Sequence, residues 1–403
     1  MNLLRKTAFL LPTVSTGLVR VLQLAIMLVL ANRGSDSDRD LLVAGFGLLT
    51  SFAMMTDSGA GNFLLSSPLG RITRNVYVRA VGFHLTLATV GAVAALVFIA
   101  WPAGGYIPPT VLALLLALAV TQTVDSTGRI IRIPAMVAKK DAAYALPDVI
   151  LFVLKVPIIV GAFLSADVRV LMLLPLPSLL VAAAALWTRY RALSRAHLRE
   201  PRLTRRILEF GVTGALSAFY SQSPLLIAAA ILPLNQIATL TIVYRLIQAL
   251  DLLPGTLSLQ MIPRVRERGT GPWPYWALFF AGGAAVALCV ILAKPLIEVL
   301  FGQQFGDVLV FIFVALSFAP KSGNYALVAF LMGIGRIRSR FVLTLIACLV
   351  SVILSLLVVH SMGATGLAGV TLLVEMAFAG GVWILLRRRP VSVEVHPLVE
   401  AGQ

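Results

Sequence analysis

The chain has 403 residues, of which 59% are hydrophobic and only 12% charged, and its mean hydropathy is +0.95. Soluble domains carry about 25% charged residues, so a chain this apolar could not cover its surface in water, whereas a bilayer suits it as a solvent. The formal net charge of +16 would suggest nucleic-acid binding in a soluble protein, but the placement of the basic residues, described below, argues against it.

Apolar runs of about 20 residues, the length that crosses the hydrocarbon core as a helix, recur along the whole chain. The first six predicted spans are 8–31, 41–65, 78–100, 107–126, 143–165 and 168–188. The second six are 207–230, 238–262, 275–300, 307–332, 341–361 and 364–386. The fourth span ends in a polar stretch from Thr121 to Thr127. The sequence therefore predicts an all-α polytopic membrane protein with about 12 transmembrane helices.

The basic residues alternate between the two sides of these spans. One set of alternate connections, together with the chain ends, holds 25 of the 33 Lys and Arg residues, and the other set holds only Arg33, Arg39 and Arg169. By the positive-inside rule the first set is cytoplasmic, so we expect a multi-pass protein of the cell membrane with both termini in the cytoplasm.

The longest basic connection, 189–206, separates six spans from six. We predict an N-terminal six-helix lobe at 1–188, a basic cytoplasmic linker at 189–206, a C-terminal six-helix lobe at 207–386 and a cytoplasmic tail at 387–403. Because each lobe contains an even number of spans, the lobes would share one orientation, as in parallel repeats. The arginines of the linker are expected to set this orientation and to contact anionic lipid.

The connections favour no enzymatic activity. They are too short for a folded catalytic domain, and they contain no catalytic constellation, metal-ligand spacing or phosphate-binding loop. Cys289 and Cys348 both lie within apolar runs and read as buried apolar side chains. We therefore expect neither a cofactor nor a metal.

Ionisable residues inside predicted spans mark candidate functional sites, because a bare charge at the bilayer centre costs about 2.5–3.5 kcal/mol or more. The basic ones are predicted to line a wet cavity and bind substrate, with inter-helix ion pairing as the alternative; they are Arg20, Lys155, Arg245 and Lys321. The acidic candidates for coupling transport to an ion are Asp57, Asp251 and Glu375. Asp148 lies two turns from Lys155, on the same helix face but out of direct contact.

Six short motifs occur in one order along the chain. They are Met55-Thr56-Asp57-Ser58-Gly59-Ala60-Gly61, Val243-Tyr244-Arg245-Leu246 with Leu253-Pro254-Gly255, Ile262-Pro263-Arg264, Leu300-Phe301-Gly302-Gln303-Gln304-Phe305, Gly333-Ile334-Gly335-Arg336 and Gly363-Ala364-Thr365-Gly366-Leu367-Ala368-Gly369. In this order they resemble the motifs of polysaccharide exporters and lipid-linked oligosaccharide flippases in the multidrug/oligosaccharidyl-lipid/polysaccharide superfamily. Thr56 departs from the family's usual Phe or Leu before the Asp, and the lipid II branch has fourteen spans where twelve are predicted here.

The resemblance implies two six-helix lobes around a central cavity with alternating access. It also implies a cargo of oligosaccharide on polyprenyl diphosphate, destined for cell-surface polysaccharide. In related flippases basic residues of spans 1 and 8 line the cavity, so the resemblance gives this role to Arg20 and Arg245. The expected partners are the lipid-linked sugar, membrane lipids and polysaccharide-assembly proteins, and nucleic acid is not among them.

Three alternatives belong to other classes. A drug or cation antiporter of the same superfamily needs cavity carboxylates, which Asp57 and Glu375 could supply, although the intramembrane basic residues argue against a cationic cargo. A major-facilitator transporter also has twelve spans, but its signature loop contains an Asp that the Gly-Arg-Ile-Thr-Arg sequence at 70–74 lacks. A scaffold without transport activity would not need charges in mid-membrane on four helices.

Overall fold

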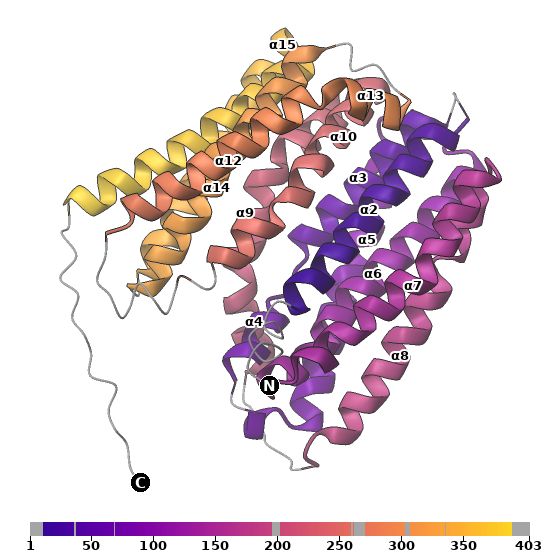
Figure 1. Ribbon diagram of the computed structural model, residues 1–403, viewed down its shortest axis with the longest axis vertical. Coiled ribbons are helices and arrows are strands. Elements are labelled where there is room, and N and C mark those ends of the chain that lie inside the picture. The colour runs from indigo at the N-terminus through magenta and orange to yellow at the C-terminus, as the bar shows by residue number, and fades with distance from the viewer. Residues whose placement is uncertain are drawn as a thin grey trace.

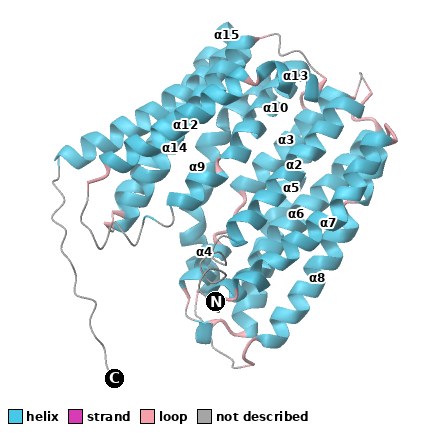
Figure 2. Ribbon diagram, viewed as in Figure 1, coloured by secondary structure: helices cyan, strands magenta, loops and turns pink. Residues whose placement is uncertain are grey.

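The computed structural model describes residues 11–35, 38–67, 69–195, 202–258, 261, 271–302, 307–334 and 336–388. Over these residues the chain consists of helices and connections, with no strand, as predicted (Figure 2). Eleven helical stretches are long and apolar enough to cross a membrane. The last, Arg338–Leu386, is 49 residues long and contains Gly363 with φ 54° and ψ −138°, which breaks it into two helices where the eleventh and twelfth spans were predicted to meet.

The helices form two groups, which lie side by side in Figure 1. The N-terminal group consists of α2 (Leu11–Arg33), α3 (Arg39–Met55), α4 (Ala60–Ser66), α5 (Arg74–Ala100), α6 (Pro109–Val137), α7 (Asp141–Leu164), the 3₁₀ helix η2 (Val168–Leu173) and α8 (Pro175–Ala192). The C-terminal group consists of α9 (Leu203–Ile231), α10 (Leu234–Leu250), α12 (Trp273–Leu292), α13 (Lys294–Phe301), α14 (Val308–Gly333) and α15 (Ile337–Arg388). A short 3₁₀ helix, η1 (Leu69–Arg71), joins α4 to α5.

Pro254 explains why α10 ends where it does. A proline ring clashes with the carbonyl four residues earlier and cannot donate to it, and here that carbonyl belongs to Leu250, the last residue of α10. The chain turns at Asp251 and is helical again from 252 to 258. By contrast, α14 continues as one helix through Pro320.

Several helices extend beyond the predicted spans, and this corrects the assignment of some basic residues. The fourth span was predicted to end at 126, which placed Arg129 and Arg132 in a connection, but both lie on α6, which continues to Val137. Hydropathy detects only the part of a helix that faces lipid. A helix forms all its backbone hydrogen bonds internally, so it can continue where polar side chains meet water or one another.

Some predictions lie outside the described residues. They include the first residues of span 1 at 8–10, the tail from 389 onward, part of the linker at 196–201, and motif residues at 262–264, 303–305 and 335. The division into two lobes at 189–206 and the cytoplasmic location of the termini stay predictions.

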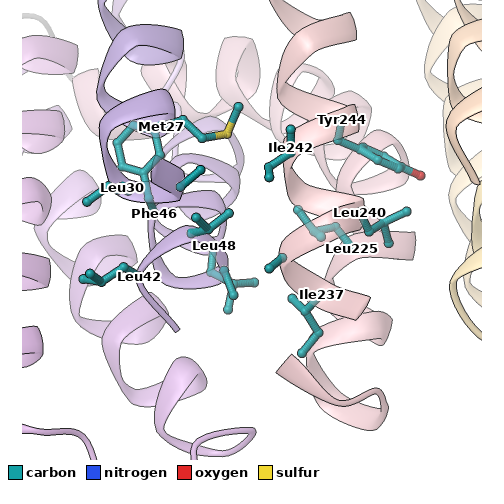
Figure 3. Close-up of a cluster of buried hydrophobic side chains, with 14 of the residues drawn as sticks. Met27, Leu30, Leu42, Phe46, Leu48, Leu225, Ile237, Leu240, Ile242 and Tyr244 are labelled. Atoms are coloured by element: carbon teal, nitrogen blue, oxygen red, sulfur yellow. The ribbon is translucent and has the colours of Figure 1, made fainter. Parts of the chain in front are cut away.

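The largest apolar cluster joins the two groups of helices. It combines Met27 and Leu30 of α2 and Phe46 of α3 with Leu225 of α9 and Ile237 of α10, all 0–2% exposed (Figure 3). Because lipid tails are as apolar as leucine, close packing stabilises such a contact more than the removal of water does.

Hydrogen bonds between the groups lie near this cluster. The Asn32 side-chain amide donates to the Leu300 carbonyl at 2.7 Å, and the Trp101 indole donates to the Ala230 carbonyl at 3.1 Å. We call this end of the molecule the sealed end. The opposite end, here called the arginine-rich end, carries the basic connections around η1, between α6 and α7, and after α8.

At the arginine-rich end two backbones touch. Gly59 precedes α4 with φ 75°, and a Cβ added there would lie 2.1 Å from the backbone nitrogen of Gly211 on α9. A Cβ on Gly211 would in turn lie 2.4 Å from the Ser58 carbonyl oxygen. Only glycine at both positions permits this approach, since neither backbone can yield as a flexible side chain would.

We expect Gly59→Ala to destabilise the protein strongly. Gly104 provides a matched control, because it also has a positive φ of 66° but no atom within 4 Å of an added Cβ. Gly104→Ala should cost only the left-handed backbone penalty of about 1–2 kcal/mol. In thermal unfolding of the purified protein, Gly59→Ala should lower Tm well beyond Gly104→Ala, and equal Tm values would contradict the close approach.

The orientation is testable by labelling. In a background without Cys289 and Cys348, a cysteine at Ser35 should react with a membrane-impermeant maleimide added to intact cells, and a cysteine at Ser194 should react only after permeabilisation. Five spans are predicted between these positions, so labelling of both from the outside would contradict this odd number.

Candidate functional site

A cavity of about 450 Å³ lies between the two groups of helices, toward the arginine-rich end. We call it the central cavity. Its volume falls in the range of about 300–1,000 Å³ that small-molecule sites occupy. Helices α2, α3, α5 and α6 line one side, and α9, α14 and α15 line the other. The charged residues of its lining are Arg20, Asp57, Arg129, Asp251, Lys321 and Arg340.

Two of these arginines have side chains that are open to the cavity. The side chains of Arg20 on α2 and Arg129 on α6 make no hydrogen bond or ion pair with any residue in the described part of the chain. Both also line a smaller space of about 50 Å³ inside the N-terminal group, beside Gln23, Gln122 and Asp125. Their guanidinium groups are therefore free to bind water or a ligand.

Lys321 and Asp251 were also predicted as site residues, and both line the cavity. Their side chains bind each other. Lys321 Nζ lies 2.6 Å from Asp251 Oδ2, and the two side chains are 15% and 13% exposed. Because both come from the C-terminal group, this pair holds α14 to the end of α10. It leaves the wall formed by these helices with little net charge at this point.

Arg245 does not line the central cavity. Its guanidinium, in a residue only 6% exposed, donates to the Gly47 carbonyl, to Ser51 Oγ at 2.6 Å and to the Gln248 side chain. These contacts join α10 to α3, across the boundary between the two groups. With Arg20 it borders a space of only about 10 Å³, which is about the size needed for one water molecule. A substrate-binding role for Arg245 stays a prediction.

Lys155 lies within the N-terminal group in an ion pair, the alternative that the sequence left open. Its ammonium is 2.6 Å from Asp125 Oδ2 on α6. Asp148, on the same helix as Lys155, pairs instead with Arg132 at 2.5 Å, with both side chains at most 4% exposed. Two ion pairs thus connect α6 to α7.

The remaining acidic candidates differ in exposure. Asp57 is exposed on the cavity and accepts a hydrogen bond from the Gly59 backbone N–H at 3.2 Å. Glu375 is 2% exposed and accepts hydrogen bonds from the Asn324 amide at 2.8 Å and the Tyr220 hydroxyl at 3.3 Å. Since Asn324 and Tyr220 both line the cavity, Glu375 orients two of its wall residues.

Sequence reasoning missed Arg129 and His84. Arg129 has a signal, since Gln122, Ser126 and Arg129 recur at intervals of four and three residues, as one face of a helix does. His84 has none, because it stands alone in an apolar run. The tertiary structure places its ring between Ser58 Oγ at 3.0 Å and Ser126 Oγ at 3.3 Å, at the edge of the cavity.

We expect Lys155→Met to lower Tm, since it leaves the Asp125 carboxylate without the cation that ties α6 to α7. Because Asp125 is 24% exposed, the loss should fall below the roughly 3–5 kcal/mol typical of a fully buried pair. Adding Asp125→Leu should restore most of the loss. Lys294 pairs with Glu298 at 2.6 Å within one helix, α13, so Lys294→Met serves as the control: it breaks no contact between helices and should lower Tm less. A double variant no more stable than Lys155→Met alone would contradict the pairing.

No protein-family model and no curated protein matches the sequence. Solved structures do match it over nearly its whole length. The lipid II flippase MurJ in an inward closed conformation aligns with a TM-score of 0.69 at 14% identity, covering 94% of this chain and 87% of that one. An inward-facing MATE-family multidrug resistance transporter aligns with a TM-score of 0.67 at 14% identity, covering 92% and 94%.

A transporter from Pyrococcus furiosus, described as having a binding pocket of reversed polarity, aligns with a TM-score of 0.63 at 14% identity, covering 94% of each chain. At such identities the likeness establishes the fold and leaves the substrate open. The chain therefore has the fold of the flippases and MATE transporters of the multidrug/oligosaccharidyl-lipid/polysaccharide superfamily, as its motifs predicted.

Proposed function

We propose that the protein is a transporter that moves a lipid-linked oligosaccharide across the cell membrane by alternating access. The observation that carries this proposal is the pair of unpartnered arginines, Arg20 and Arg129, on a cavity between two groups of helices. A charge inside a span, such as that of Arg20, is expensive without a counter-charge unless water or an anion meets it. Arg129 adds a second open cation to the same cavity, so the site suits an anionic cargo.

The diphosphate of such a lipid matches these side chains. A guanidinium presents a planar fork of donors that binds phosphate oxygens in pairs, and charge-assisted hydrogen bonds of this kind are about twice as strong as neutral ones. The prenyl tail would remain in the bilayer while the cavity shields the polar head from hydrocarbon. Arg20 keeps the role that the family motifs implied, and Arg129 joins it from the same group of helices.

Transport requires a second state in which the cavity opens at the other end. The contacts to be broken are those of the sealed end, such as the Asn32–Leu300 and Trp101–Ala230 hydrogen bonds. We propose that the two groups of helices rock about their shared apolar cluster, as in other transporters built from repeats. Enzymes that assemble cell-surface polysaccharide would supply the cargo on one face and use it on the other.

A cation antiporter is the second candidate, and Asp57 is the observation in its favour. This carboxylate is exposed on the central cavity and forms no ion pair with any described residue. Four cationic side chains on the same cavity oppose it, since only the charge of Lys321 is matched by a carboxylate within 4 Å. If purified protein bound a cationic dye, with loss of binding in Asp57→Asn, the antiporter would become the better proposal.

We expect Arg20→Gln and Arg129→Gln each to weaken binding of a polyprenyl diphosphate by about tenfold or more, because each removes a charge-assisted contact worth about 1.5–3 kcal/mol. Lysine at these positions should rescue only in part, since it keeps the charge and loses the planar fork. Tm should change little, because neither side chain binds another described residue.

Arg245→Gln is the comparison variant. It removes contacts between α10 and α3, so it should lower Tm as its main effect. Binding can be measured on protein in nanodiscs, and export in cells at matched protein levels. A well-folded Arg20→Gln/Arg129→Gln double variant that bound and exported like wild type would overturn the proposed role of these arginines.

A further inference from the structure

The two walls of the central cavity differ in chemistry. The free cations Arg20 and Arg129 both belong to the N-terminal wall, formed by α2 and α6. On the C-terminal wall, Lys321 is matched by Asp251 at 2.6 Å, and the Glu375 carboxylate lies behind Asn324. This wall also carries Arg340, whose guanidinium donates to Met332 Sδ at 3.1 Å. With Glu375 counted, two cations face two carboxylates, so a neutral polar group suits this wall.

Asn324 on α14 carries an acceptor that has no donor. Its side-chain nitrogen donates to Glu375 Oε2 and to the Glu375 carbonyl, both at 2.8 Å. Because a carboxylate and a carbonyl can only accept, the amide cannot be turned around, and Oδ1 must face the other way. This oxygen is itself buried and has no hydrogen-bond partner among the described residues. Asn324 is 4% exposed and lines the cavity, so a ligand reaches the oxygen once the side chain shifts toward it.

Ser217 on α9 adds an acceptor of the same kind. Its hydroxyl hydrogen is used by the Thr213 carbonyl at 2.9 Å, which leaves the oxygen lone pairs for a ligand. Both groups are therefore hydrogen-bond acceptors that would bind a ligand able to donate hydrogen bonds. Burying an acceptor without a donor is unfavourable, so a ligand hydroxyl that reaches Asn324 would recover part of that cost.

Two aromatic residues line the same cavity as these acceptors. The Tyr220 and Phe378 rings are parallel within 7°, with centroids 6.4 Å apart, and both line the cavity. Glu375 holds the Tyr220 hydroxyl, so this ring has a defined orientation. The face of an aromatic ring is electron-rich and attracts the weakly positive C–H groups of a sugar ring. Hydroxyl donors combined with C–H faces are the chemistry of a carbohydrate.

We infer that Asn324, Ser217, Tyr220 and Phe378 form a subsite for the sugar head of the cargo, opposite the arginines that bind its diphosphate. This inference rests on the proposed function and names the part of the cargo that each wall recognises. An organic cation would also suit acceptors and aromatic faces, but Arg20 and Arg129 across the cavity would repel it. The diphosphate site confers affinity for any lipid of this class, and the sugar subsite confers specificity.

Two probes separate the subsites: a polyprenyl diphosphate without sugar, and the same lipid carrying a disaccharide. Binding of each is measured on the full chain in nanodiscs. We expect wild type to bind the sugar-bearing lipid more tightly. Phe378→Leu and Asn324→Ser should each raise its Kd by about fivefold to tenfold. The Kd of the sugar-free lipid should stay within about twofold.

Two control variants complete the experiment. Phe280→Leu makes the same ring deletion in the C-terminal group, where Phe280 packs on Trp276 away from the cavity, and should change neither Kd. Arg20→Gln should raise both Kd values. If Asn324→Ser fails to fold because Glu375 loses a partner, Phe378→Leu still tests the subsite.

If Phe378→Leu weakened the binding of both lipids equally, or of neither, the sugar subsite would be overturned while the diphosphate site stands. The same is true if wild type binds the two lipids equally. Failure of wild type to bind either lipid would overturn the proposed function, and the subsite with it. Tight binding of a cationic dye that Phe378→Leu abolishes, with lipid binding unchanged, would assign this wall to a cation instead.

Discussion

A charge inside an apolar bundle needs an opposite charge, a set of oriented dipoles or water, and this protein uses all three. The Arg132–Asp148, Lys155–Asp125 and Lys321–Asp251 pairs use the first. Arg245 uses the second, through the carbonyl, hydroxyl and amide oxygens around it. Arg20 and Arg129 depend on the third, because only the cavity meets them. These three arrangements stabilise a buried charge in different ways, so the intramembrane arginines differ in their availability to a ligand.

The open charges line a cavity that the packing of the two groups of helices leaves unfilled. The apolar cluster around Met27, Phe46 and Ile237 closes the sealed end, whereas at the arginine-rich end the Gly59–Gly211 approach leaves room for the central cavity beside it. In the proposed alternating access, contacts of this kind would open at one end and form at the other, and the charges on the cavity would select the cargo.

The chemistry of the walls bears on how one fold can serve both lipid flippases and drug transporters. The helices and their arrangement are shared, so specificity must come from side chains on the cavity. Here the N-terminal wall presents Arg20 and Arg129 beside Asp57, and the C-terminal wall combines the Lys321–Asp251 pair and Arg340 with aromatic rings and hydrogen-bond acceptors. Glu375 contributes without contacting the cavity itself, by orienting Asn324 and Tyr220. A carboxylate that looks like an ion-coupling site in the sequence therefore also has a structural task.

The sequence by itself determined the membrane environment, the all-helical class and the spans, because the length of an apolar run is dictated by bilayer thickness alone. Its motifs also indicated the fold. It could not place the ends of α6, and so it assigned Arg129 to a connection, since hydropathy reports lipid contact and not helicity. Nor could it tell Arg20 from Arg245, both of which are single arginines in apolar spans. Only the tertiary structure decided which of them binds protein and which faces the cavity, because partners such as Gly47 and Ser51 are almost 200 residues away along the chain.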